Sequence, residues 1–410
     1  MAHTLQPPGI ENAEALYARI RAENQAHWPR FSAAEYQRRY AAIRTAMAER
    51  HIDCLLMFSN GYVFSANLIY VGNYIDIAYG AIVFPLDQEP TLFASLYSFL
   101  PQAAAQSGIR DVRWGAGVNH QALVERLKEG GLETGTVGIA DRVPHDLWLF
   151  LHDALPEATF VEAQDLMYQI RLCASPEEIE WYQKGAELCD RAFRAVVDTV
   201  EPGMKDSEII ATLHGTYLKL GGSLYGAALA STPMAQPSIP YSWWVAGGST
   251  RTIRPGDLIL TETTGTYYGY PGQLIRPVAL GEPPPQLKKL EELAVTLYSE
   301  VQKVVKVGNT PRDVFALSRR ILDEGYTVQC PVIHGYTQVI NPPYASVPGD
   351  PCWAVDLDVP FQENQLIVIE PNPVTRDMQR GFFIGDMNRV TPQGASSLHQ
   401  YPLQLTVKAV

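Results

Sequence analysis

The sequence predicts two domains, an α/β domain followed by an α+β domain. Five short apolar runs between residues 54 and 163 alternate with segments of helical periodicity, and that alternation is typical of an α/β domain. The second part changes to long, β-rich stretches. A chain of 410 residues is also too long for one ordinary hydrophobic core. We therefore expect an N-terminal arm at residues 1–31, a first domain at 32–165 and a second domain at 166–410.

The first domain begins after an arm that we expect to be irregular and that contains Pro7 and Pro8. Ser32 and Glu35 have the spacing of a capping box, in which each side chain hydrogen-bonds the backbone N–H of the other residue, and they predict the start of a helix. The apolar runs that follow are the predicted strands, at residues 54–59, 79–86, 91–95, 136–141 and 159–163.

A helix with clear start and stop signals opens the second domain. Residues 175–178 (Ser-Pro-Glu-Glu) supply an N-cap, a proline at the first helical position and a glutamate at the third. We expect this helix to end near Val200, because Glu201-Pro202-Gly203 follows.

Two further patterns shape the second domain. Residues 257–280 predict two strands folded at Gly269–Gly272. Segments 203–211 and 308–316 resemble each other, and each follows a long helix. They suggest a duplicated half with pseudo-two-fold symmetry, although so loose a match also arises by chance.

Composition excludes several classes of protein. Apolar residues make up 46% and charged residues 19%, an ordinary globular mixture. The net charge of −12 disfavours binding to nucleic acid, which depends on Lys and Arg. We expect no membrane span and no secretory signal, because neither apolar pattern is present. Five cysteines without CxxC spacing fit a reduced compartment, so we expect a cytoplasmic protein.

Two glutamates stand in apolar strands of the second domain. Glu262 lies inside LILTETTG, and Glu370 ends the apolar run of QLIVIEPNPV. A buried carboxylate is costly unless it is paired or its pKa is shifted, and such shifts prepare a general base or a nucleophile. The alternatives are a solvent-facing strand position for Glu262 and a carboxylate held by backbone donors at a turn for Glu370.

His334, in PVIHGY, is the third candidate, although a single histidine is often only a hydrogen-bonded core residue. No HxH, HExxH, GxSxG, P-loop or GxGxxG pattern is present. Aromatic residues, among them Trp243, Trp244 and Tyr270, are candidates for lining a substrate pocket, with core packing as the alternative.

These segments resemble the creatinase, prolidase and methionine-aminopeptidase superfamily, whose catalytic domain has the pita-bread fold. The likeness covers about residues 32–400 and implies an α/β creatinase-type N-terminal domain before an α+β pita-bread domain with duplicated halves. In metal-binding members the ligands are Asp, Asp, His, Glu and Glu. The matching positions here are Glu262, Gln273, His334, Glu370 and Gly385.

The departures from this pattern predict a site without metal or other cofactor. Gln273 offers a neutral amide and Gly385 offers no side chain, so too few anionic groups remain to offset the charge of two divalent ions. Asp386 is adjacent to Gly385, but neighbouring side chains on a strand point to opposite faces. The metal-free members that the chain resembles, creatinase and ectoine hydrolase, cleave C–N bonds of small molecules.

The resemblance therefore implies a metal-independent hydrolase of a small amide, cyclic amidine or related molecule. Glu262 would be the nucleophile or general base, His334 an acid/base group or oxyanion donor, and Glu370 an orienting carboxylate or a partner for a substrate ammonium group. Gln273 would bind the substrate. The alternatives are an inactive binding or scaffold protein on the same fold, and a residual metal-dependent Xaa-Pro peptidase-like or lyase enzyme.

Superfamily relatives are commonly homodimers in which the N-terminal domain of one subunit helps to close the active site of the other. The resemblance implies the same here, with Tyr74 and Asp76 as candidates for reaching the small-molecule substrate across the dimer.

Overall fold

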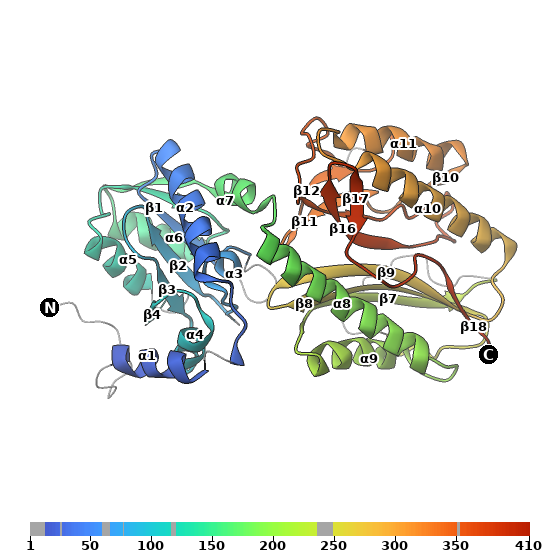
Figure 1. Cartoon of the computed structure of the whole chain (residues 1–410), viewed down its shortest axis with the longest axis horizontal. Helices are drawn as coiled ribbons and strands as arrows, with labels where there is room; N and C mark the ends of the chain where they lie inside the picture. Colours follow the sequence, from blue (N-terminus) through green and yellow to red (C-terminus); the bar gives the residue numbers. More distant parts are fainter. Residues whose placement is uncertain are drawn as a thin grey trace. The chain divides into compact units, whose positions relative to one another are not determined.

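The computed structural model describes residues 13–24, 27–59, 66–76, 78–115, 120–235, 249–350 and 353–410 (Figure 1). The chain divides into two compact units, Met1–Leu172 and Cys173–Val410. The division falls after Leu172 rather than after residue 165, because α7 (Gln164–Arg171) packs on α2 (Ala33–Glu49) of the first unit. Of the helices within the described ranges, none is long and apolar enough to cross a membrane.

The first unit is built on a six-stranded sheet in the order β4-β3-β2-β1-β5-β6. Parallel pairs (β1 with β5, β3 with β4, β5 with β6) are mixed with antiparallel pairs (β1 with β2, β2 with β3). The strands are β1 (Cys54–Phe58), β2 (Ala81–Pro85), β3 (Thr91–Ala94), β4 (Asp111–Trp114), β5 (Thr136–Ile139) and β6 (Thr159–Glu162). The helices besides α2 and α7 are α1 (Ala13–Asn24), α3 (Ala66–Gly72), the 3-10 helix η2 (Tyr97–Phe99), α4 (Leu100–Gln106), α5 (His120–Glu129) and α6 (His145–Ala154).

All five predicted strands of the first domain are confirmed, and β4 is an additional one. The expectation of an irregular arm is wrong, because α1 forms within it and packs on α4. The Arg21 guanidinium fixes α1 by donating to the carbonyl oxygens of Ala104 (3.0 Å) and Ile109 (2.7 Å). Ser32 caps α2 as predicted, but the Glu35 carboxylate pairs with Arg38 and Arg39.

The second unit contains a ten-stranded sheet whose main path runs β13-β12-β11-β14-β16-β9-β8-β7, with β17 on β16 and β18 on β9. Its helices are α8 (Pro176–Thr199), α9 (Asp206–Lys219), α10 (Pro285–Val304) and α11 (Pro311–Asp323). Its first strands are β7 (Ser223–Pro233), β8 (Asp257–Tyr267), β9 (Tyr270–Leu280), β11 (Ile333–Tyr336) and β12 (Ile340–Ala345). The others are β13 (Ala354–Val355), β14 (Leu366–Ile369), β16 (Gly385–Thr391), β17 (Gly394–Ser397) and β18 (Thr406–Lys408), while β10 (Tyr326–Thr327) and β15 (Val374–Thr375) pair separately.

The second unit repeats one arrangement of elements. Two helices precede strands in each half: α8 and α9 lie against β7, β8 and β9, and α10 and α11 lie against strands of the other half (Figure 1). α9 and α11 begin in the two segments whose sequences resemble each other. At both starts a carboxylate three residues into the helix accepts from the N-cap backbone N–H, at 2.7 Å for Glu208 and 2.9 Å for Asp313.

The turn between β8 and β9 lies two residues earlier than the midpoint of the predicted one. Tyr268 (φ 50°) and Gly269 (φ 85°) form the two-residue loop, and Pro271 and Gly272 belong to β9. Positive φ at both loop positions is the geometry that joins antiparallel strands with the correct twist. The long β8–β9 hairpin carries two of the five positions that resemble a metal centre.

Candidate active site

Four neighbouring strands place the candidate residues on one face of the sheet. Glu262 in β8 pairs with Ile275 in β9, and Ile275 pairs with Gly385 in β16. Ile369, the last residue of β14, pairs with Asp386, and Glu370 directly after the strand lies next to Gly385. Directly opposed residues point to the same face of a sheet, and the two glutamates therefore face the same space.

His334 reaches this space from β11. It pairs with Val368, two residues before Glu370 and therefore on the same face. The His334 Nε2 atom lies 3.5 Å from Glu370 Oε1, and both side chains are buried. The Nδ1 atom lies 3.0 Å from the backbone oxygen of Gly335, which can only accept, so Nδ1 carries the proton and Nε2 presents a lone pair to Glu370.

Burial shifts the titration of all three groups. Desolvation raises the pKa of Glu262 to about 7. Desolvation and the neighbouring charge of Glu262 raise the pKa of Glu370 well above its ordinary value. Desolvation lowers the pKa of His334 to about 4, against a smaller opposing effect of the Gly335 carbonyl. These shifts favour the protonated form of Glu370, a neutral imidazole and a Glu262 near its midpoint at neutral pH, an arrangement suited to general acid–base chemistry.

Gln273 belongs to the same face, because its partner Thr264 lies two residues after Glu262. The side chain is 1% exposed, and its Oε1 atom has no hydrogen-bond partner among the described residues. A buried acceptor without a donor is costly, so this oxygen is available to a ligand N–H.

Gly385 is packed rather than open. A Cβ atom at this position would lie 2.8 Å from Glu370 Cβ, 3.0 Å from the Ile369 oxygen and 3.1 Å from Ile275 Cδ1. The space that a ligand side chain would need is therefore filled by its neighbours.

Asp386 lies on the opposite face, as the strand alternation predicts. Its Oδ1 atom accepts from Arg276 Nη2 at 2.7 Å in a buried ion pair, and Oδ2 accepts from Ser397 (2.9 Å) and Tyr298 (3.2 Å). Arg276 also donates to the backbone oxygens of Ile275 and Gly385. This pair supports the strands beneath the site and offers it no ligand. Across the described parts of the chain, no group of three His, Cys, Asp or Glu side chains could hold a metal ion.

Two further neighbours of the site, Tyr336 and Cys330, were not among the predicted site residues. Tyr336, 1% exposed, has its ring centroid 5.7 Å from that of His334, and burial, Tyr225 and the charge of Glu262 raise its pKa well above the ordinary value. Burial and the charges of Glu370 and Glu262 raise the pKa of the Cys330 thiol well above its ordinary value, so this cysteine is protonated and is not a thiolate nucleophile. Tyr336 lies two residues after His334, and this spacing was the signal that could have placed it on the same face of the strand as His334.

Tyr270, which was also predicted to bind the substrate, faces α8 instead of this group. Tyr270 is fully buried, stacks edge-on with Trp181 of α8 and donates to Glu178 at 3.2 Å. Tyr74 and Asp76 are buried in the first unit, where the Tyr74 hydroxyl donates to Asp76 at 3.2 Å. Trp243 and Trp244 lie outside the described residues.

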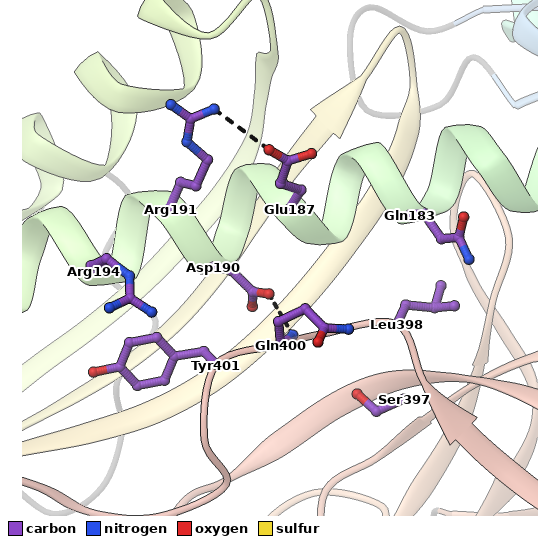
Figure 2. A pocket seen from close by; sticks show the side chains of 9 residues that line it. All are labelled: Gln183, Glu187, Asp190, Arg191, Arg194, Ser397, Leu398, Gln400 and Tyr401. Atoms are coloured by element: carbon purple, nitrogen blue, oxygen red, sulfur yellow. Dashed lines mark hydrogen bonds and ion pairs between the residues drawn. The ribbon is translucent and has the colours of Figure 1, made fainter.

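A surface pocket of about 430 Å³ lies elsewhere, between α8 and the segment after β17 (Figure 2). Its charged groups are already engaged: Glu187 pairs with Arg191, and Asp190 accepts from the Gln400 backbone N–H at 2.6 Å. Asp190 also binds the buried His399 at 2.8 Å. The pocket contains none of the candidate catalytic residues.

Comparisons with known proteins agree with this arrangement. The family model of metallopeptidase family M24 matches residues 180–392, and that of the creatinase/prolidase N-terminal domain matches residues 39–173. A creatinase from a Bacillus species is 25% identical over 310 residues, 72% of each chain. A probable dipeptidase PepE from Mycobacterium tuberculosis is 25% identical over 93% of this chain and 99% of its own. The ectoine hydrolase of Halomonas elongata is 23% identical over 62% of this chain and 64% of its own.

Solved structures confirm the predicted two-domain fold. The Xaa-Pro dipeptidase from Bacillus anthracis superposes with a TM-score of 0.74 at 22% identity, over 91% of this chain and 100% of that one. The dipeptidase PepE from Mycobacterium ulcerans superposes with a TM-score of 0.72 at 24% identity, over 93% of this chain and 100% of that one.

Proposed function

Because the chain belongs to metallopeptidase family M24 and carries a creatinase/prolidase N-terminal domain, we propose that it hydrolyses a C–N bond of a small nitrogen-containing molecule without a metal ion. Relatives named as creatinase, dipeptidase and ectoine hydrolase support a hydrolase. The observation that carries the proposal is the group of Glu262, His334 and Glu370 on one face of the sheet, in which His334 and Glu370 are buried and Glu262 is partly exposed.

The donor set does not fit the metal centre that the family name implies. Gln273 stands at the position of a carboxylate ligand in metal-binding members, and it is neutral. At Gly385 the neighbouring side chains fill the place of a ligand. Burial and the charge of Glu262 raise the pKa of Glu370, and two carboxyl groups that shift each other's pKa suit chemistry by proton transfer.

Glu262 is the group suited to activating water. Its pKa near 7 leaves a substantial carboxylate fraction at neutral pH and makes that carboxylate a stronger base than an ordinary glutamate. In the proposed reaction Glu262 accepts a proton from water while the water oxygen bonds to the substrate carbon. Direct attack by the Glu262 carboxylate on that carbon is the alternative.

Glu370 is the group suited to donating a proton. Burial and the charge of Glu262 raise its pKa well above the ordinary value, which favours the protonated carboxyl group, and this group faces the lone pair of His334 Nε2. In the proposed reaction Glu370 donates this proton to the leaving nitrogen as the C–N bond breaks. Glu262 then carries the proton taken from water, and its return to Glu370 restores the starting state.

The test is turnover of a panel of small amides, cyclic amidines and dipeptides by chain purified without chelator, with release of amine or ammonia as the readout. We expect turnover that survives a strong chelator and is lost in Glu262→Gln and in Glu370→Gln. Glu292→Gln, on the exposed side of α10, is the matched control. Loss of activity on chelation with recovery on adding a divalent ion would contradict the proposal, as would one tightly bound transition ion per chain.

A further inference from the structure

Glu370 lies on a segment where regular strand pairing ends. It directly follows the last residue of β14, and its backbone N–H donates to the carbonyl oxygen of Val332 at 2.8 Å. The next residues are Pro371-Asn372-Pro373, and a proline has no N–H with which to extend a strand ladder. The position of the Glu370 carboxyl group therefore depends on what fixes this segment.

The side chain of Asn372 bonds to two other parts of the second unit. Its Oδ1 atom accepts from the backbone N–H of Ile384 at 3.0 Å, and its Nδ2 atom donates to the Cys330 sulfur at 3.4 Å. Asn372 is 0% exposed, which is unusual for an asparagine and costs free energy unless such bonds are formed. This amide thus joins the segments before β11, after β14 and before β16.

Both segments that the amide joins to β14 also contact Glu370. The first contains Cys330 and, two residues later, Val332, whose carbonyl oxygen holds the Glu370 N–H. The second leads into Gly385 at the start of β16, where an added Cβ atom would lie 2.8 Å from Glu370 Cβ. Glu370 is therefore held between the same two segments.

The contact between Glu370 and His334 is sensitive to small movements. Glu370 Oε1 lies 3.5 Å from His334 Nε2, at the outer limit of a hydrogen bond. The imidazole is fixed from its other side, because Nδ1 donates to the Gly335 carbonyl oxygen at 3.0 Å. A small displacement of the segment that carries Glu370 is therefore enough to break the contact.

We propose that Asn372 is a positioning residue: by joining Cys330 to Ile384 it fixes the segment that carries Glu370 and keeps this carboxyl group against His334. The catalytic part of the inference rests on the proposed function, in which Glu370 donates a proton to the leaving nitrogen. The contact between Glu370 and His334 depends on no reaction and is tested by itself. Cys330 then serves as the acceptor for the Asn372 amide.

One substitution and a matched control separate positioning from stability. Asn372→Leu removes both hydrogen bonds at similar side-chain size. Asn388→Leu is the control, because Asn388 is also 0% exposed and donates to the Tyr298 hydroxyl at 3.1 Å and to the Asp386 carbonyl oxygen at 2.8 Å. Asn388 lies three residues after Gly385 on β16 and so points to the opposite face. A loss of stability alone should appear in both variants.

The first measurement records the nitrogen NMR shifts of the histidine rings in the full chain at neutral pH, with His334→Gln identifying the signals of His334. The Nε2 shift changes when its lone pair accepts a hydrogen bond. We expect Asn372→Leu to move this signal toward the value of a free lone pair, and Asn388→Leu to leave it in place. An unmoved signal in folded Asn372→Leu, or an equal movement in Asn388→Leu, overturns the proposal.

If Asn372→Leu does not fold, two variants of Cys330 provide the same test. Cys330→Ala removes only the acceptor of the Asn372 amide, and Cys330→Ser replaces it with a hydroxyl group. We expect Cys330→Ala to move the His334 Nε2 signal in the same direction by a smaller amount, and Cys330→Ser to return it toward the wild type. The same signal in the wild type and both variants overturns the proposal.

The second measurement separates kcat from KM on an amide that the wild type hydrolyses. We expect Asn372→Leu to lower kcat by about a hundredfold, the scale of a misplaced catalytic group, with little change in KM. A raised KM with the kcat of the wild type overturns the proposal. If the wild type hydrolyses nothing, the proposed function fails, and the His334 signal still decides the role of Asn372.

Discussion

Replacing Glu262 by glutamine removes a carboxyl group whose ionised form the fold disfavours. The pKa of Glu262 in the folded chain is raised from 4.5 to about 7, so between these values the unfolded chain releases a proton that the folded chain keeps. The contribution of Glu262 to the stability of the wild type therefore falls as pH rises from 4.5 to about 7, and this contribution levels off above that. Glu262→Gln should not show this loss of stability with rising pH.

The size of the effect follows from the shift. Each unit of pKa difference corresponds to about 1.4 kcal/mol, so the shift of Glu262 corresponds to about 3 kcal/mol of unfolding free energy. We expect Glu262→Gln to match the wild type at pH 4 and to exceed it by about that amount at pH 8. The gain in stability should accompany the loss of activity, as happens when a catalytic group is held in an unfavourable environment.

Urea unfolding at a series of pH values, followed by a signal from the second unit, measures this difference. Glu292→Gln, an exposed position on α10, makes the same chemical change without burial and should follow the wild type at every pH. If Glu262→Gln differs from the wild type in unfolding free energy by the same amount at pH 4 and pH 8, or is less stable at pH 8, ionisation of Glu262 does not destabilise the folded chain.

Three other substitutions test the surroundings of the site. His334→Gln should remove an acid-induced loss of stability of about 3 kcal/mol between pH 6.5 and 4, because the folded pKa of His334 is lowered to about 4. If the variant still loses this stability in acid, His334 is not the cause of the loss. Gly385→Ala should destabilise by about 1–3 kcal/mol in thermal unfolding, whereas Gly215→Ala, in open space on α9, should stabilise; equal effects contradict the packing argument. Arg276→Met should cost about 3–5 kcal/mol by leaving Asp386 buried without its partner, and adding Asp386→Leu should recover part of it; no recovery means that the charge is not the cause.

Much of the fold could be predicted from the sequence because the local sequence signals agree with the tertiary structure. The capping box at Ser175 and Glu178 is present with both hydrogen bonds, at 3.2 Å and 3.0 Å, and the helix it starts ends at Thr199. The segment around α1 lacked such a cap, and its helix is fixed by Arg21 contacts to distant carbonyl groups that no local pattern reveals.

The candidate site was predictable only in part, for the same reason. Glu262, His334 and Glu370 could be found because each interrupts or ends an apolar run. The closeness of Tyr336 to Glu262 could not be predicted, because three strands separate β11 from β8 in the sheet. Tyr270 is an aromatic residue of the kind that lines pockets, but strand alternation points its side chain toward α8.

The packing around Gly385 has a historical consequence. Any mutation that adds a side chain at this position meets the Cβ atom of Glu370 and the Cδ1 atom of Ile275 before it can contribute to function. Its first effect is a loss of stability, and natural selection removes such a variant unless its neighbours have already become smaller. The glycine therefore resists substitution: a side chain can be gained at position 385 only together with changes in the residues that pack against it.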